Sequence, residues 1–173
     1  MFEKGYIQIY TGNGKGKTTA AVGVAVRAIG NGMKVFFGQF LKHRHSSEHT
    51  IFADYPNSIK LVQFGTDQFV IGEPSALDFE CAESGLDLSR KAIQSGYYDL
   101  VVLDELNAAI NLGLIELNAV IGILKSKPEH VEIIITGRNA PPELVELAHL
   151  VSEVNEVKHY YKIGVGARAG IEE

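Results

Sequence analysis

The sequence predicts an α/β fold, a mostly parallel sheet with helices on both faces. Three observations support it: β-branched and aromatic runs alternate with helical patterns, two runs are apolar at consecutive positions, and a glycine-rich turn joins the first run to an apolar helix start. The consecutively apolar runs, at 100–103 and 133–135, suit strands buried on both faces. We expect these two strands at the centre of the sheet.

Six strands are expected, in the order in which the β-branched and aromatic runs occur. They are Tyr6–Tyr10, Lys34–Phe40, Ser58–Phe64, Leu100–Asp104, Glu132–Thr136 and Val157–Tyr161.

Helices are expected where apolar residues recur at i, i+3, i+4 and i+7, as they do over 117–124 and 144–151. A longer helix is predicted over 75–94, with Ser75 as its N-cap. Its expected buried arc is Leu77, Cys81, Leu88 and Ala92.

Length and composition indicate one globular domain spanning 1–173. A net charge of −5 argues against bulk nucleic acid or an anionic membrane as the main partner. The single cysteine, Cys81, cannot form an intrachain disulfide, and neither an export signal nor a membrane-length apolar run is found. We therefore expect a cytoplasmic protein with no membrane partner.

The strongest local signal is the segment 11–19, Thr-Gly-Asn-Gly-Lys-Gly-Lys-Thr-Thr, between the first strand and an apolar helix start. Glycines let backbone N–H groups turn inward toward phosphate, and the helix N-terminus adds positive potential. Lys17 supplies a cation and Thr18 a hydroxyl for Mg²⁺. Thr11 stands where the general P-loop pattern has its first glycine. The predicted phosphate-binding residues are Gly12, Asn13, Gly14, Lys15, Gly16, Lys17, Thr18 and Thr19.

A second signal is the apolar strand that ends in Asp104 and Glu105. Mg²⁺ prefers oxygen ligands, and a P-loop places its metal where carboxylates at a neighbouring strand end can reach it. Alone, such a pair is often only a solvated strand end. With the P-loop, it predicts a Mg²⁺–nucleoside triphosphate site.

Two arginines are further candidates for nucleotide contact. Arg138 follows the strand 132–136 at the same expected edge of the sheet, and Arg27 lies on the helix that the loop begins. Either side chain can equally be a solvated surface charge. These residues together predict a site that binds a nucleotide, but they do not indicate which reaction takes place there.

Several segments together resemble the P-loop type of ATP:corrinoid adenosyltransferase. They are 11–21, Gln39-Phe40, Val101 to Asn107, Thr136-Gly137-Arg138 and the tail from Val157 to Glu172. Thr11 is itself typical of that family. The resemblance implies a RecA-like P-loop NTPase fold and formation of adenosylcobalamin, by transfer of the 5′-deoxyadenosyl group of ATP to the Co(I) of a reduced corrinoid with release of triphosphate.

The resemblance also implies roles for particular residues. Thr18 and Glu105 would ligate Mg²⁺, with Asp104 nearby, and Arg27 would contact the nucleotide. Phe69, which can also be read as a buried aromatic residue, is the candidate for excluding the lower axial ligand of cobalt, with Gln39 and Phe40 near the corrin.

The partners implied by the resemblance are ATP, cobalamin or a cobyrinic acid derivative, an electron-donating reductase or flavoprotein, and a second copy in a homodimer. Two alternatives remain open on the residues alone. One is a small-molecule kinase, because the same P-loop and carboxylates serve phosphoryl transfer. The other is a non-enzymatic, ATP-dependent corrinoid-binding switch.

Overall fold

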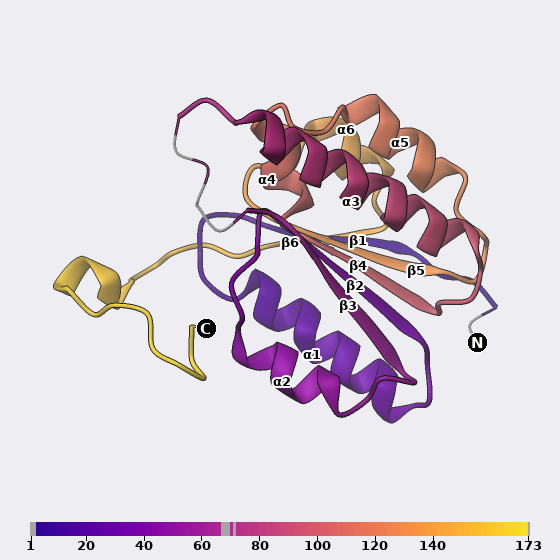
Figure 1. Cartoon of the computed structure of the whole chain (residues 1–173), viewed down its shortest axis with the longest axis horizontal. Helices are drawn as coiled ribbons and strands as arrows, with labels where there is room; N and C mark the ends of the chain where they lie inside the picture. Colours follow the sequence, from indigo (N-terminus) through magenta and orange to yellow (C-terminus); the bar gives the residue numbers. More distant parts are fainter. Residues whose placement is uncertain (1–2, 67–69, 71, 173) are drawn as a thin grey trace.

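The structure, a computed structural model, describes residues 3–66, 70 and 72–172. One six-stranded sheet runs through it in the order β3-β2-β4-β5-β1-β6, and every neighbouring pair is parallel (Figure 1). This confirms the predicted α/β class. The strands are β1 (Ile7–Thr11), β2 (Val35–Phe40), β3 (Ile59–Phe64), β4 (Leu100–Asp104), β5 (Glu132–Thr136) and β6 (Leu150–Glu153).

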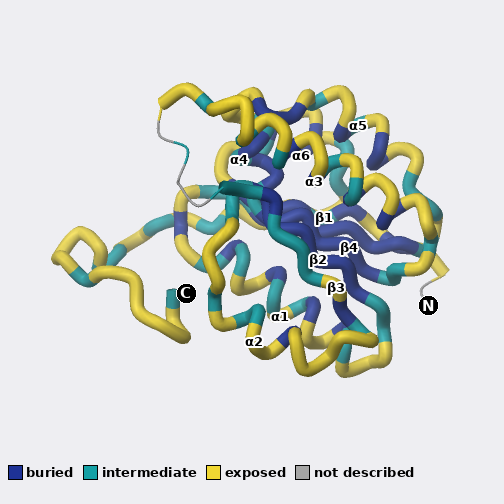
Figure 2. Tube along the Cα trace, in the orientation of Figure 1, coloured by how far each residue is buried: buried dark blue, intermediate teal, exposed yellow. Residues whose placement is uncertain are grey.

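Helices cover both faces of the sheet (Figure 1). On one face lie α1 (Lys17–Gly30) and α2 (Ser47–Ala53). The other face carries α3 (Ala76–Gln94), α4 (Leu106–Asn111), α5 (Leu117–Lys125) and α6 (Pro142–Leu147). The strands β2, β4 and β5 therefore form the middle of the layer and are buried from both sides (Figure 2).

Alternate residues of the central strands enter two different hydrophobic clusters. Val101 and Leu103 of β4 pack toward α3 to α6, whereas Leu100 and Val102 pack toward α1 and α2. Helices cover β4 on both faces, so neither face of this strand is polar. This explains why residues 100–103 are apolar at consecutive positions.

Helix α1 meets the sheet with small residues, Ala21, Ala25 and Ala28, all buried. Their spacing of four and three places them on one helical stripe, and their size allows close approach to the strands. The helix that follows the glycine-rich turn is thus held firmly against β4 and β5, which it contacts.

Helix α3 begins where the sequence predicted, with Ser75 as N-cap in a capping box with Asp78. Its buried face differs from the predicted arc, because Leu77 is exposed and Cys81 only partly buried. Ala92 of the predicted arc is buried, and Leu88 is partly buried against the core. The other buried residues of α3 are Ala82, Gly85, Ser89 and Ile93. At Gly85 an added Cβ would meet the Phe64 ring at 2.6 Å, which explains why this face is small.

The prediction for the last strand is wrong. The segment 157–161 forms no strand; Val157 is 96% exposed and a 3₁₀ helix follows at Tyr160–Ile163. The sixth strand is β6, which overlaps the end of the apolar pattern that predicted a helix over 144–151, and α6 stops at Leu147. Pairing with β1 accounts for this, because it satisfies the backbone of 150–153 along the sheet edge.

None of the helices within the described ranges is both long and apolar enough to span a bilayer.

Candidate functional site

The candidate site lies at the carboxyl ends of β1, β2, β4 and β5, where parallel α/β sheets collect their ligands. Three non-glycine residues there have left-handed backbone angles: Leu41, Glu105 and Asn139, with φ of 58°, 59° and 52°. Each lies just beyond a strand end. Such angles cost about 1–3 kcal/mol each and concentrate at functional sites.

The glycine-rich loop follows β1 and packs against the segment after β6. Gly14 N–H donates to the Val154 carbonyl at 2.7 Å, and Val154 N–H donates to the Thr11 carbonyl at 2.8 Å. Gly12 has φ of +94°, and a Cβ there would lie 2.5 Å from the Val154 oxygen, so a side chain does not fit. The loop conformation thus depends on the end of β6.

Backbone donors of the loop are free to receive phosphate. Within the described residues, the N–H groups of Lys15 and Gly16 meet no hydrogen-bond acceptor. The N–H groups of Lys17 and Thr18, in the first turn of α1, have no carbonyl four residues earlier within the helix. The loop and helix start together offer a row of donors for an anion.

Lys17 is the first residue of α1, directly after the loop, and is only 7% exposed. Its ammonium group donates to the Gly14 carbonyl at 2.7 Å, within the loop itself. Burial lowers the pKa of Lys17, and the Arg138 charge lowers it further, whereas Glu105 and Asp104 oppose the shift. A buried cation with a weak neutral partner favours an anionic ligand.

Asp104 is fully buried, and both of its carboxylate oxygens have partners. Oδ1 accepts hydrogen bonds from the hydroxyls of Thr18, at 2.8 Å, and Thr136, at 2.5 Å. Oδ2 accepts from the ammonium of Lys42 at 2.6 Å and lies 3.5 Å from Nε2 of Gln39. Asp104 therefore ties the start of α1 to β2 and β5.

Glu105 follows directly and is the N-cap of α4. Its N–H donates to the Thr136 hydroxyl at 3.0 Å. Burial raises the pKa of Glu105 and the neighbouring Asp104 adds to the rise, whereas Lys42, Lys17 and Arg138 lower it. Two carboxylates next to three cations form a charged cluster at the mouth of the loop.

The donor set at this point fits magnesium. The Thr18 hydroxyl and the Glu105 carboxylate supply oxygen atoms, which this hard cation prefers. Glu105 has no hydrogen bond to its carboxylate among the described residues, whereas the oxygens of Asp104 are already occupied. We therefore distinguish Glu105 as the candidate direct ligand and Asp104 as the group that orients Thr18.

The two predicted arginines lie in different places. Arg138 is exposed just after β5, and its charge lowers the pKa of Lys17 and of Glu105, so it belongs to the cluster. Arg27 is exposed in the last turn of α1. Nine residues of helix place it about 13 Å along the axis from Thr18. The nucleotide contact of Arg27 stays a prediction.

Gln39 and Phe40, at the end of β2, are both fully buried. The Phe40 ring packs on Phe64 at 5.3 Å between centroids. Gln39 accepts a hydrogen bond from Nε2 of His49 at 2.8 Å and donates to Glu48 at 3.2 Å. Neither residue presents exposed surface to a corrin, so their predicted contact is untested and would require rearrangement.

A hollow of about 680 Å³ lies beside the loop. Its walls are the first turns of α1, the segment 41–48 with α2, and part of the C-terminal tail. The tail leaves β6, runs away from the sheet and returns toward α1 and α2 (Figure 1). It thus completes the wall of a cavity that begins at Thr18 and Thr19.

The tail contacts the loop directly. Lys15 donates to the Ile171 carbonyl at 3.1 Å, and its ammonium lies 3.9 Å from the Glu172 carboxylate. Glu172 also pairs with Arg168 at 3.1 Å and accepts a hydrogen bond from the Tyr160 hydroxyl. The hydrogen bonds from Arg168 and Tyr160 lower the pKa of Glu172 to about 2.

Sequence reasoning missed Lys42, Thr136 and Glu172 as members of the site. The strand-end rule would have found Thr136, which closes β5 at the predicted edge. No local pattern places Lys42 or Glu172, because their contacts join segments far apart in the chain. Phe69 lies outside the described residues.

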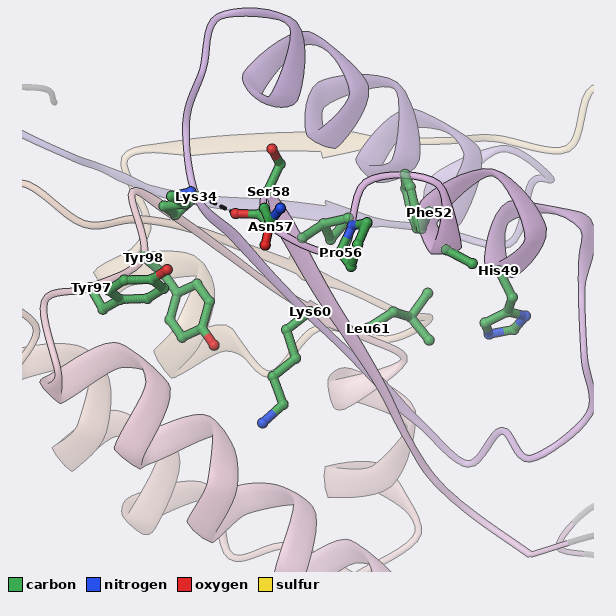
Figure 3. A pocket seen from close by; sticks show the side chains of 12 residues that line it. Lys34, His49, Phe52, Pro56, Asn57, Ser58, Lys60, Leu61, Tyr97 and Tyr98 are labelled. Carbon is green, nitrogen blue, oxygen red and sulfur yellow. Dashed lines mark hydrogen bonds between the residues drawn. The ribbon is translucent and has the colours of Figure 1, made fainter.

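A second hollow, of about 520 Å³, lies along the edge strand β3 (Figure 3). It is bordered by Lys60 and Leu61 of β3 and by the rings of Tyr97 and Tyr98. Lys34 there donates to the Asn57 carbonyl at 2.5 Å. None of the predicted site residues that the structure describes lines it, so the candidate site is placed on the loop side.

Comparisons with known proteins show which family this chain is similar to. The model of the family described as ATP:corrinoid adenosyltransferase BtuR/CobO/CobP matches residues 3–172. A corrinoid adenosyltransferase of Pseudomonas aeruginosa is 34% identical over 171 residues, covering 98% of this chain and 84% of the relative. Those of Salmonella typhimurium and Escherichia coli are 34% and 36% identical, each match covering 98% of this chain and 86% of the relative.

Proposed function

The chain belongs to the ATP:corrinoid adenosyltransferase family, and from this we infer that it transfers the 5′-deoxyadenosyl group of ATP to the Co(I) of a reduced corrinoid. Neither the kinase nor the binding-switch alternative receives support from the comparisons. The observation that carries the proposal is the buried Lys17 within a loop of free N–H donors, next to a carboxylate pair.

The reaction needs no nucleophile from the protein. An electron pair of Co(I) forms the bond to the 5′ carbon of ATP, and the electron pair of the broken carbon–oxygen bond leaves with triphosphate. Negative charge thus develops on the departing oxygen. The task of this chain is to hold the two substrates in line and to stabilise that charge.

We propose that the triphosphate lies in the glycine-rich loop. The N–H groups of Lys15, Gly16, Lys17 and Thr18 would donate to its oxygens. The Lys17 ammonium would exchange the Gly14 carbonyl for a phosphate oxygen, so that its hydrogen-bond acceptor would become an anion. Arg138 would add a second cation from the side of β5.

Magnesium is proposed as the cofactor, with Thr18 and Glu105 as its ligands. When bound, it would neutralise charge on the leaving triphosphate. Asp104 holds the Thr18 hydroxyl in place through Oδ1, so its part is orientation.

Other elements of the proposal concern the corrinoid side. Cobalamin or a cobyrinic acid derivative is the expected acceptor, with Phe69, Gln39 and Phe40 as candidates on its lower side. An electron-donating reductase or flavoprotein would supply Co(I), and a homodimer is the expected assembly.

The deciding experiment is incubation of the protein with ATP, Mg²⁺ and chemically reduced cobalamin. The absorption spectrum of the corrinoid should change to that of the alkylated form as triphosphate appears. Lys17→Ala should lose at least 100-fold in rate while its circular dichroism stays that of the wild type, and Lys125→Ala, on an exposed turn of α5, should match the wild type. Formation of ADP in place of triphosphate would refute adenosyl transfer.

A further inference from the structure

Helix α4 carries two asparagines, Asn107 and Asn111, four residues apart. This spacing places both side chains on one helical face. The helix starts at Glu105, so the same short element that presents the candidate metal ligand also presents these two amides. Neither asparagine belongs to the site described above.

Both amides hydrogen-bond to the turn that carries Arg138. Nδ2 of Asn107 donates to the Gly137 carbonyl at 3.1 Å. Nδ2 of Asn111 donates to the carbonyls of Arg138, at 3.1 Å, and Asn139, at 2.9 Å. Three consecutive carbonyls are therefore fixed by two side chains.

The same turn is held from its other side by the strand that leads into the phosphate loop. Gly137 N–H donates to the Tyr10 carbonyl at 3.2 Å, and Ala140 N–H donates to the Thr11 hydroxyl at 3.1 Å. Thr11 thus has a structural use where a general P-loop has glycine. The turn is clamped between α4 and β1.

The backbone of this turn needs such support. Gly137 and Asn139 have φ of 128° and 52°, in the left-handed region. A Cβ at Gly137 would lie 2.9 Å from Cβ of Asn107, so the turn is in close contact with α4. A strained conformation persists only where surrounding contacts over-determine it.

The turn presents Arg138, which is an exposed residue. Within the described residues, the Arg138 guanidinium makes no hydrogen bond or ion pair. The turn that carries Arg138 adjoins the start of the glycine-rich loop, because Ala140 N–H donates to the Thr11 hydroxyl at 3.1 Å. An exposed arginine on such a turn suits bidentate binding of phosphate oxygens.

We propose that Asn107 and Asn111 are positioning residues for the reaction: they fix the 137–140 turn so that Arg138 meets the triphosphate opposite Lys17. The inference rests on the proposed function, because it takes the loop as the triphosphate site. Asn111 is the better residue to test, since it is exposed and alanine is a stronger helix former. Asn107 is fully buried, and its replacement risks the fold.

The test measures binding of inorganic tripolyphosphate with Mg²⁺ by calorimetry to the wild type and to four variants: Lys17→Ala, Arg138→Ala, Asn111→Ala and the double Arg138→Ala/Asn111→Ala. Arg138→Ala should weaken binding about 10–100-fold. Asn111→Ala should weaken it several-fold, and the double variant should match Arg138→Ala, because Asn111 acts through Arg138. Asn118→Ala, on an exposed face of α5, is the matched control and should bind normally.

The other outcomes refute either the positioning role or the proposed function. If Lys17→Ala weakens binding but Asn111→Ala does not, or if the losses of Asn111→Ala and Arg138→Ala multiply in the double variant, the positioning role is refuted and the proposed function stands. The role is equally refuted if Arg138→Ala binds as the wild type while Lys17→Ala does not. If Lys17→Ala itself binds normally, the loop is not the triphosphate site and the proposed function fails.

Discussion

The ammonium of Lys42 lies 2.6 Å from Oδ2 of Asp104, at the ends of two neighbouring strands. The Asp104 side chain has no exposed surface, whereas that of Lys42 is 31% exposed. Together with the two threonine hydroxyls on Oδ1, this contact gives a buried charge a complete set of partners. Removing one partner of a buried charge costs more folding stability than forming the ion pair adds.

Lys42→Met should therefore lower the stability of the protein. We expect a loss of about 2 kcal/mol, less than for a fully buried pair because Lys42 is partly exposed. For a chain of this length, that corresponds to a fall in Tm of about 4–8 °C. Lys60→Met, on the exposed side of β3, is the control, and an equal Tm in the two variants would show that the Lys42–Asp104 pair contributes nothing.

Glu105→Gln should change the dependence of the rate on Mg²⁺, whereas Asp104→Asn should change the stability of the protein. Glu105→Gln removes charge from the candidate metal ligand, so the Mg²⁺ concentration for half-maximal rate should rise roughly tenfold or more, with corrinoid affinity unchanged. Asp104→Asn places an amide donor among the donors of Thr18, Thr136 and Lys42, so we expect a fall in Tm. Titrations of Mg²⁺ and thermal melts of both variants separate the effects, and a loss confined to corrinoid binding in Glu105→Gln would contradict the metal assignment.

The contact of the tail with the loop should depend on pH. The pKa of Glu172 is lowered to about 2, from a usual value of 4.5. A carboxyl group with a depressed pKa stabilises the folded contact above 4.5, and this stabilisation is lost as the pH falls toward 2. Hydrogen exchange of the amides of Ile171 and Glu172, which donate to the Arg168 carbonyl, reports on that contact.

In Glu172→Gln these two amides should exchange faster than in the wild type at pH 5 to 7, and the difference should disappear near pH 2. Glu143→Gln, on α6, serves as the control for a surface charge change. Equal protection in the wild type and in Glu172→Gln at pH 6 would mean that the carboxylate does not hold the tail.

The glycines of the loop and of the helix after it should respond oppositely to alanine. Gly12→Ala combines a left-handed backbone with a Cβ 2.5 Å from a backbone oxygen of Val154, and we expect a loss of about 2–5 kcal/mol. Gly23→Ala lies in α1 with no atom near the added Cβ, and should gain about 0.5–1 kcal/mol. Urea unfolding measures both changes, and equal stability of the two variants would contradict the loop geometry.

Five of the six strands follow from composition because they are buried on both faces or lie next to strands that are. β6 does not, since all four of its residues are exposed and, among the strands of the described ranges, it pairs with β1 alone. Its residues therefore carry no burial pattern, and the apolar spacing of 144–151 resembles a helix. What makes the segment a strand is a pairing with the beginning of the chain, which no local window contains.

The candidate site likewise has one part that the sequence predicts and one part that it does not. Thr18, Asp104 and Glu105 could be predicted, because the glycine-rich turn and an acidic strand end must share one edge of a parallel sheet. The contact of Lys42 with Asp104 and the contact of Lys15 with the tail could not be predicted. Each joins residues that are more than fifty positions apart in the chain, and it does so through side chains.

The place of β1 between β5 and β6 has a consequence for the newborn chain. The strand that leads into the phosphate loop is made first, yet both of its neighbours are made last. At about 5–20 residues per second, a ribosome leaves it unpaired for on the order of ten seconds. On the proposed function, the ATP site would therefore be complete only after β5 and β6 have joined β1.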